Sequence, residues 1–177
     1  MMYTGSFSFK TENTLNLGQL VIPTVPLDWS GAITSAGNPA IDSLYASWVI
    51  LYALPLSCTR KCLDLATGLR QVHLASGQNY GRIKIALLLD PEHSETLSDE
   101  LLAIYPRFIL ISHPSRNFSD ALRHAGSNSS IKDDFALIFL VDPVGNIMMT
   151  YNREDSPVQL NKDLTRLLTW SKLDKRS

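Results

Sequence analysis

The sequence WVILYALPLSCTRKC, residues 48–62, decides the fold of this chain. Its first half, residues 48–54, is an apolar run rich in β-branched and aromatic side chains, which predicts a buried strand. The polar and cationic turn at residues 57–62 predicts the beginning of a helix. The stretch therefore places a helix N-terminus directly after a buried strand, where α/β proteins often carry functional residues.

The two cysteines of this turn, Cys58 and Cys62, are the only two in the chain. Positions i and i+4 of a helix share one face, so the two sulfurs are expected close enough for a disulfide or for one soft metal ion. Arg60, Lys61 and the helix N-terminus favour a thiolate at Cys58. The pair predicts redox or copper chemistry, and the alternative is two buried cysteines that serve only as small apolar side chains.

Length and composition indicate one domain and exclude some classes of partner. The chain has 177 residues, of which 45% are hydrophobic, which is enough for one well-buried core and short for two. Its 16 basic and 17 acidic residues give a net charge of −1, so no electrostatic signature of nucleic acid or of an anionic membrane is present. The sequence shows no apolar stretch of the ~20 residues that a transmembrane helix needs.

From residue 44 onward the apolar pattern alternates between strand and helix. The predicted strands are residues 44–54, 82–90, 108–112, 135–141 and 147–151, and the predicted helices are residues 59–76, 95–105, 119–125 and 159–171. A tight turn at residues 142–145, with Gly145 suited to a positive φ, joins the last two strands. The order βαβαβ(α)ββα is that of a thioredoxin-like α/β domain, with a central mixed sheet flanked by helices.

The first part of the chain, residues 1–43, is rich in Ser, Thr, Asn, Gly and Pro and has few apolar clusters. This composition predicts an extended N-terminal arm that packs on the core, with Trp29 as an anchor. We therefore expect two parts, this arm and a thioredoxin-like domain at residues 44–177.

The predicted topology brings three loops together. Parallel strands have their C-terminal ends at one edge of a sheet, and loop residues converge there. On that edge we expect the turn with Cys58 and Cys62, the loop at residues 90–93 and the loop at residues 112–114.

Three segments carry a resemblance to a known family. The first is the strand that leads into Cys58-x-x-x-Cys62, the second comprises residues 88–96 and 105–109, and the third is the hairpin at residues 139–146. In this order they resemble the CxxxC copper-binding loop, the DPERDTP stretch with its following strand, and the hairpin of the Sco (SenC) proteins of cytochrome c oxidase assembly. The resemblance covers roughly residues 44–151.

More closely, the chain resembles a Sco-related group of proteobacterial proteins associated with cytochrome oxidase. These proteins typically carry an N-terminal membrane anchor and an external thioredoxin-like domain. The resemblance implies the soluble part of an anchored protein on the periplasmic side of the bacterial inner membrane. It also implies a partner, which is a cytochrome c oxidase subunit or another oxidase assembly factor.

The third copper ligand of the family has no direct counterpart. In Sco proteins a histidine just before the fourth strand completes the copper site, and the matching position here is Asp134. Copper(I) prefers thiolate or imidazole donors to a carboxylate, so this replacement weakens the expected site. His93 and His113 lie on loops at the predicted sulfur edge and are the candidate replacement ligands.

Three functions remain open on this basis. In the redox hypothesis, Cys58 attacks a target disulfide as a thiolate and Cys62 resolves the mixed disulfide. In the copper hypothesis, the two cysteines hold copper(I) together with His113, His93 or Asp134. In the third hypothesis the protein is a non-catalytic adaptor of the oxidase, and its cysteines form a structural disulfide.

Overall fold

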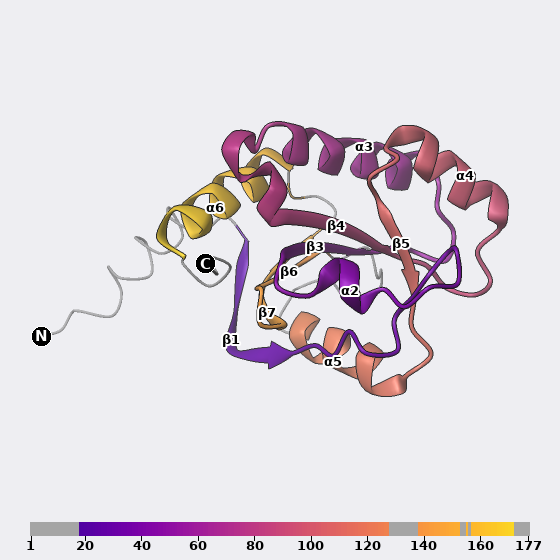
Figure 1. Cartoon of the computed structure of the whole chain (residues 1–177), viewed down its shortest axis with the longest axis horizontal. Helices are drawn as coiled ribbons and strands as arrows, with labels where there is room; N and C mark the ends of the chain where they lie inside the picture. Colours follow the sequence, from indigo (N-terminus) through magenta and orange to yellow (C-terminus); the bar gives the residue numbers. More distant parts are fainter. Residues whose placement is uncertain (1–17, 128–137, 153–154, 156, 172–177) are drawn as a thin grey trace, which may run out of the picture.

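A seven-stranded mixed sheet forms the centre of the molecule, and helices lie on both of its faces (Figure 1). The computed structural model describes residues 18–127, 138–152, 155 and 157–171. The strands are β1 (Gln19–Pro26), β2 (Ile33–Thr34), β3 (Trp48–Ala53), β4 (Ile83–Leu88), β5 (Ile109–Ser112), β6 (Ile138–Val141) and β7 (Asn146–Tyr151), in the order β1-β7-β6-β3-β4-β5-β2. This architecture confirms the predicted thioredoxin-like fold with a central mixed sheet.

Strand β3 lies in the middle of the sheet. It pairs in parallel with β4, from Trp48 opposite Ile83 to Ala53 opposite Leu88, and antiparallel with β6 on its other side. The first five residues of β3 are buried, and alternate side chains enter two different core clusters. Burial on both faces explains why this strand is apolar without alternation.

The helices divide between the two faces. They are α2 (Ile41–Leu44), α3 (Arg60–Leu74), α4 (Glu95–Ile104), α5 (Arg116–Gly126) and α6 (Pro157–Trp170), with a 3₁₀ helix η1 (Gly77–Arg82) before β4. Helices α3, α4 and α6 share one core cluster, whereas α5 packs with β1 in the other. None of the described helices combines the length and the apolar character needed to cross a membrane.

The hairpin between β6 and β7 has the predicted turn. The Asp142 carboxylate accepts hydrogen bonds from the backbone N–H groups of Val144 (3.0 Å) and Asn146 (2.9 Å). Gly145 has φ +93°, a conformation that glycine adopts without a steric penalty. The turn residues therefore fix the register of the hairpin.

The described residues of the predicted arm supply both edges of the sheet. Strand β1 pairs antiparallel with β7, and β2 pairs antiparallel with β5. Trp29, with 5% of its surface exposed, lies against Phe118 of α5 with ring centroids 5.9 Å apart, so it anchors this segment as expected. The division of the chain at residues 43 and 44 into an arm and a domain stays a prediction.

The boundary predicted for the start of the first strand was wrong. The strand expected at residues 44–54 begins only at Trp48, because Leu44 ends the short helix α2. Ala46, between the two elements, has φ +62°, which is incompatible with a continuous extended strand. Leu44 is buried like the strand residues, so apolar character alone did not reveal the break.

Helix α6 is attached to the sheet through a buried carboxylate. Asp163, which is fully buried, accepts hydrogen bonds from the Tyr151 hydroxyl (3.0 Å), the Gly18 backbone N–H (2.8 Å) and the Arg166 guanidinium (2.9 Å). Burial and the neighbouring Asp163 raise the pKa of Tyr151 far above its usual value. The Tyr151 hydroxyl therefore stays protonated and is the donor of the hydrogen bond to Asp163. One side chain therefore joins α6, β7 and the start of β1.

We expect Asp163→Ala to lower the free energy of unfolding by about 2–4 kcal/mol, because it leaves the buried Tyr151 hydroxyl with only a weak acceptor, the Met149 sulfur at 3.5 Å. Tyr151→Phe removes one hydrogen bond without creating an unpaired donor, and should cost only about 1 kcal/mol. Urea unfolding of both variants checks this order. An equal loss in the two variants would contradict it.

A second buried polar network links α3 to the segments around it. His73, 5% exposed, has Nε2 at 2.9 Å from the Tyr80 carbonyl oxygen, so Nε2 carries the proton. Its Nδ1 then accepts a hydrogen bond from the Tyr105 hydroxyl (2.9 Å), which itself lies 3.0 Å from the Tyr80 hydroxyl. The pKa of His73 is lowered by burial and by the positive charges of Arg107 and Lys84. The pKa of Tyr105 is raised to about 12 by burial and by the hydrogen bond with the Tyr80 hydroxyl.

The lowered pKa of His73 makes stability depend on pH. Between the usual value of about 6.5 and the lower value in the fold, the unfolded chain binds more protons than the folded one, so stability is lost as pH falls through this window. We expect His73→Gln, which keeps an N–H donor, to flatten this loss in urea unfolding measured from pH 7 to pH 5. His124→Gln on the exposed side of α5 is the matched control, and an unchanged slope in His73→Gln would contradict the assignment.

Candidate functional site

The centre of the candidate site is a disulfide between Cys58 and Cys62, with Cα atoms 5.2 Å apart. Thr59 is the N-cap residue of α3, so Cys58 lies just before the helix and Cys62 lies in its first turn. The loop that carries Cys58 leaves the C-terminal end of β3. The pair therefore lies at the beginning of α3, as its sequence context predicts.

The two sulfurs differ in their exposure. Cys62 is 5% exposed and belongs to the core cluster under α3, whereas Cys58 is half-buried at its margin. An external thiol or disulfide thus reaches Cys58 and not Cys62. This difference agrees with the redox hypothesis, in which Cys58 attacks and Cys62 resolves.

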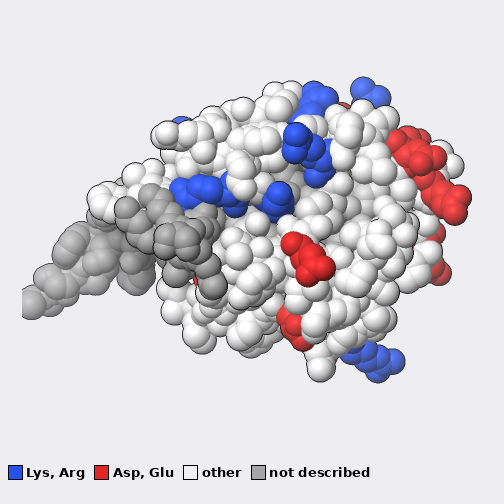
Figure 2. All heavy atoms as spheres, viewed as in Figure 1, with Lys and Arg blue, Asp and Glu red and all other residues white. Residues whose placement is uncertain are grey.

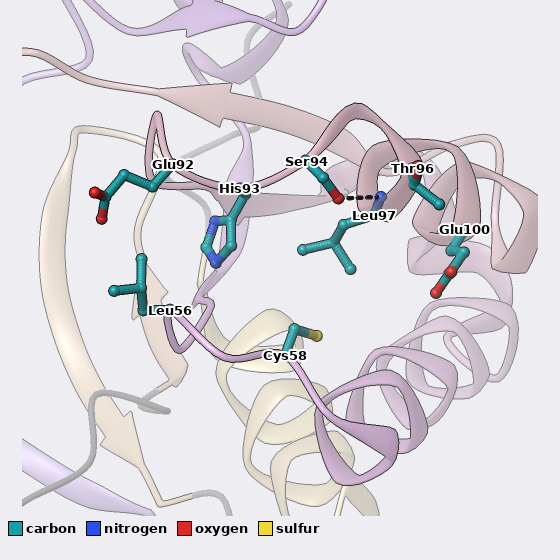
Figure 3. Close-up of a pocket in the computed structure, with 8 residues that line it drawn as sticks. All are labelled: Leu56, Cys58, Glu92, His93, Ser94, Thr96, Leu97 and Glu100. Carbon is teal, nitrogen blue, oxygen red and sulfur yellow. Dashed lines mark hydrogen bonds between the residues drawn. The ribbon is translucent and has the colours of Figure 1, made fainter.

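Cys58 borders a cleft of about 340 Å³ between the β3–α3 loop and the beginning of α4 (Figure 3). Its lining residues are Leu56, Cys58, Glu92, His93, Ser94, Thr96, Leu97 and Glu100. The walls combine two leucine side chains with two carboxylates and the His93 ring. The cleft therefore offers both apolar and polar contacts beside a sulfur that can be attacked.

His93 holds the two loops of this site together. The Asp90 backbone N–H donates to Nδ1 of His93 (2.8 Å), so this nitrogen is an acceptor and carries no proton. The proton is then on Nε2, which lies 2.9 Å from the Pro55 carbonyl oxygen and donates to it. Both nitrogens of His93 are thereby engaged with backbone groups.

Acidic side chains lie on the α4 side of the site. The exposed carboxylates of α4 are Glu95, Asp99 and Glu100, and Figure 2 shows acidic side chains gathered over this part of the molecule. On the other side, the exposed Arg60 forms an ion pair with Asp64 at 3.3 Å. An exposed pair of this kind contributes little to stability.

His113 does not share the cleft of Cys58 and His93. It lies in the loop after β5, where its Nδ1 accepts a hydrogen bond from the Ser115 backbone N–H (3.1 Å). Its ring stacks on Phe118 of α5, with centroids 4.2 Å apart, in contact with the other core cluster. The remaining predicted ligand, Asp134, lies outside the described residues.

A copper site with three protein ligands is not assembled by the described residues. Each cysteine sulfur is bonded to the other, and reduction would provide two soft donors. Within residues 18–127 and the later described segments, no group of three His, Cys, Asp or Glu side chains is placed to hold a metal ion. Because Asp134 lies outside the described residues and both sulfurs are oxidised, the metal site that the resemblance implies stays a prediction.

The wall that α4 contributes to the cleft was not predicted from the sequence. Leu97 is four residues after His93, and Glu100 is three residues after Leu97, so these side chains lie along one face of the helix and its N-terminal turn. Ser94 begins this helix, and its side chain accepts a hydrogen bond from the Leu97 N–H (3.2 Å). The capping serine and this spacing were the signals that could have revealed the wall.

Comparison with known proteins identifies a family and a fold. The sequence profile of the family described as "Transmembrane-like, thioredoxin-like, C-terminal domain" matches residues 48–171. No curated protein matches the sequence.

Three solved structures illustrate the similarity in fold. Copper-bound ScoI of Arabidopsis thaliana has a TM-score of 0.64 at 16% identity, over 80% of this chain and 97% of its own. BsSco, described as a Sco-family cytochrome c oxidase assembly protein with a disulfide switch, has a TM-score of 0.60 at 14% identity, over 88% and 96%. A thiol:disulfide interchange protein from Bacteroides sp. has a TM-score of 0.56 at 15% identity, over 88% and 91%.

The structural similarity confirms the predicted resemblance to Sco proteins at the level of the fold. The profile covers most of the chain, from the beginning of β3 to the end of α6. The chain therefore belongs to the family of transmembrane-like, thioredoxin-like C-terminal domains, and it has the fold of the Sco/SenC proteins.

Proposed function

We propose that this protein carries out thiol–disulfide exchange through Cys58 and Cys62 during the assembly of cytochrome c oxidase. The observation that carries the proposal is the disulfide at the N-terminus of α3, with one accessible and one buried sulfur beside a cleft. An accessible attacking sulfur and a protected resolving sulfur are the two parts that dithiol exchange requires.

The exchange proceeds in two steps. In the dithiol form, the Cys58 thiolate attacks one sulfur of a target disulfide, which forms a mixed disulfide and releases the other target sulfur as a thiolate. The Cys62 thiolate then attacks Sγ of Cys58, which forms the intramolecular disulfide and releases the second target sulfur. Two electrons pass from the protein to its target, and the same steps in reverse oxidise a target dithiol.

A purely structural disulfide is less well supported. The two cysteines are only four residues apart, so their bond closes a very short loop. In the chain-entropy description such a loop stabilises a fold by about 2 kcal/mol, compared with about 4.7 kcal/mol for a loop of 100 residues. The half-buried position of Cys58 also exposes the bond to reductants.

The setting of the reaction follows from the family resemblance and from sulfur chemistry. Disulfides persist in oxidising compartments such as the bacterial periplasm, which supports a place on the periplasmic side of the inner membrane with an N-terminal anchor. The proposed target is the cysteine pair of an oxidase copper site or of another assembly factor. Solved Sco proteins bind copper, so copper(I) binding by the reduced pair is the alternative function.

The proposal predicts a trapped intermediate. We expect Cys62→Ser, once reduced and mixed with glutathione disulfide, to accumulate a stable Cys58–glutathione adduct, because the resolving thiol is absent. Cys58→Ser should form at least tenfold less adduct over the same time, since its remaining thiol is buried. Intact-protein mass spectrometry measures both.

Equal labelling of the two variants would contradict the assigned roles. Anaerobic titration of the reduced wild type with Cu(I) against a competing chelator tests the alternative. Tight one-to-one binding that both cysteine variants lose, together with no exchange activity, would favour a copper chaperone.

The reduction potential separates exchange from a structural role. We expect equilibrium with glutathione buffers to give a potential above about −300 mV, the range of labile and catalytic disulfides. A value well below this limit would support the adaptor hypothesis and contradict the proposed exchange. Alkylation followed by mass spectrometry reports the fraction of oxidised protein at each buffer ratio.

A further inference from the structure

His93 stands on a turn that hydrogen bonds make rigid. Its backbone N–H donates to the Asp90 carbonyl oxygen (2.9 Å), and the Glu92 N–H donates to the Asp90 carboxylate (2.9 Å). The next residue, Ser94, caps α4. The Asp90 N–H bond to Nδ1 then fixes the ring itself, so the Nε2 proton has a defined direction.

The loop that carries Cys58 is held much less firmly. The Leu54 N–H donates to the Leu88 carbonyl oxygen (3.1 Å), and this bond extends the pairing of β3 with β4. In the next hydrogen bond along the chain, the Pro55 carbonyl oxygen accepts from Nε2–H of His93 (2.9 Å). In this part of the described chain, no hydrogen bond joins Leu56 or Ser57 to another segment. The bond from His93 is therefore the last hydrogen bond between this loop and a neighbouring segment before Cys58.

We propose that His93 is the positioning residue of the redox pair: its Nε2–H holds the Pro55 carbonyl and thereby keeps Cys58 close to Cys62 when the disulfide is open. The inference rests on the proposed exchange function and assigns His93 a role other than metal ligation. Both loops meet at the cleft, and Figure 3 shows the His93 ring extending from the α4 side toward the loop between Leu56 and Cys58.

The direction of the effect follows from chain entropy. In the oxidised protein the disulfide itself restrains Cys58, whether or not Pro55 is held. In the reduced protein the covalent restraint is absent, and the His93 bond is the last hydrogen bond that restrains the loop before Cys58. Its loss therefore frees the reduced state more than the oxidised state. Closing the disulfide then becomes less favourable, and the reduction potential rises.

Three substitutions at residue 93 separate the two bonds of the ring. In His93→Gln the side-chain amide places an N–H near the position of Nε2 and keeps a donor for Pro55. In His93→Asn the shorter side chain keeps an acceptor for the Asp90 N–H and cannot reach Pro55. His93→Ala loses both bonds, and His124→Gln on the exposed side of α5 is the matched control.

The potentials of the full-length variants in glutathione buffers test the inference. We expect His93→Asn and His93→Ala to weaken disulfide formation by threefold to tenfold, which corresponds to about 15–30 mV because a tenfold change equals 29.6 mV. His93→Gln and His124→Gln should stay within twofold of the wild type. Melting temperatures should fall more in the oxidised than in the reduced Asn and Ala variants, because a disulfide that forms less favourably in the folded protein stabilises the oxidised fold less.

Two results would overturn the inference. One is a wild-type potential in all three His93 variants, with equal losses of melting temperature in both redox states, which would show a merely structural histidine. The other is an equal shift in all three variants, which would point to the packing of the ring and not to its Nε2 donor. A wild-type potential below about −300 mV would defeat the proposed exchange function, yet the order of the variants would still test the role of His93.

Discussion

The parallel pairing of β3 with β4 is the constraint on which the rest of the molecule depends. All six residues of β3 are in register with β4, and the strand lies between β4 and β6 with both faces buried. Parallel pairing places the C-terminal ends of the two strands at the same edge. Whatever follows β3 must therefore emerge beside whatever follows β4. The Cys58 loop and the turn that carries His93 are the two segments that this register brings together.

The site built at this edge combines a rigid and a less rigid half. The half after β4 has a hydrogen-bonded turn and a capped helix, while the half after β3 runs from Pro55 to the first turn of α3 with few ties. A redox pair benefits from such a combination, because the attacking sulfur must move when its bond opens and must return for the bond to close. In the proposed exchange, the buried Cys62 on α3 is the stationary partner.

The sequence predicted those features that depend on local patterns. The unbroken apolar run of β3, the turn at Asp142 and Gly145 and the cysteine spacing each have a local physical cause, and all three are present. The features it missed depend on long-range contacts. No periodicity indicates that the predicted arm adds strands at both edges of the sheet, because a two-residue strand such as β2 leaves no pattern. Similarly, only the fold shows that His113 stacks on Phe118 and that His93 bonds to Pro55.

The surroundings of His93 also bear on copper. A histidine that binds a metal usually donates its other N–H to a carbonyl or a carboxylate, and its second nitrogen faces the ion with a free lone pair. His93 has the first half of this arrangement, since Nε2–H donates to Pro55, but its lone pair on Nδ1 already accepts the Asp90 N–H. Binding a metal through Nε2 would require the other tautomer, with the proton on Nδ1. This Nδ1–H would point at the Asp90 N–H, which is itself a donor, and the Pro55 carbonyl would lose its hydrogen-bond partner. Each lost hydrogen bond costs about 0.5–1.5 kcal/mol, so the backbone around His93 favours the tautomer that ties the two loops over the one that ligates a metal.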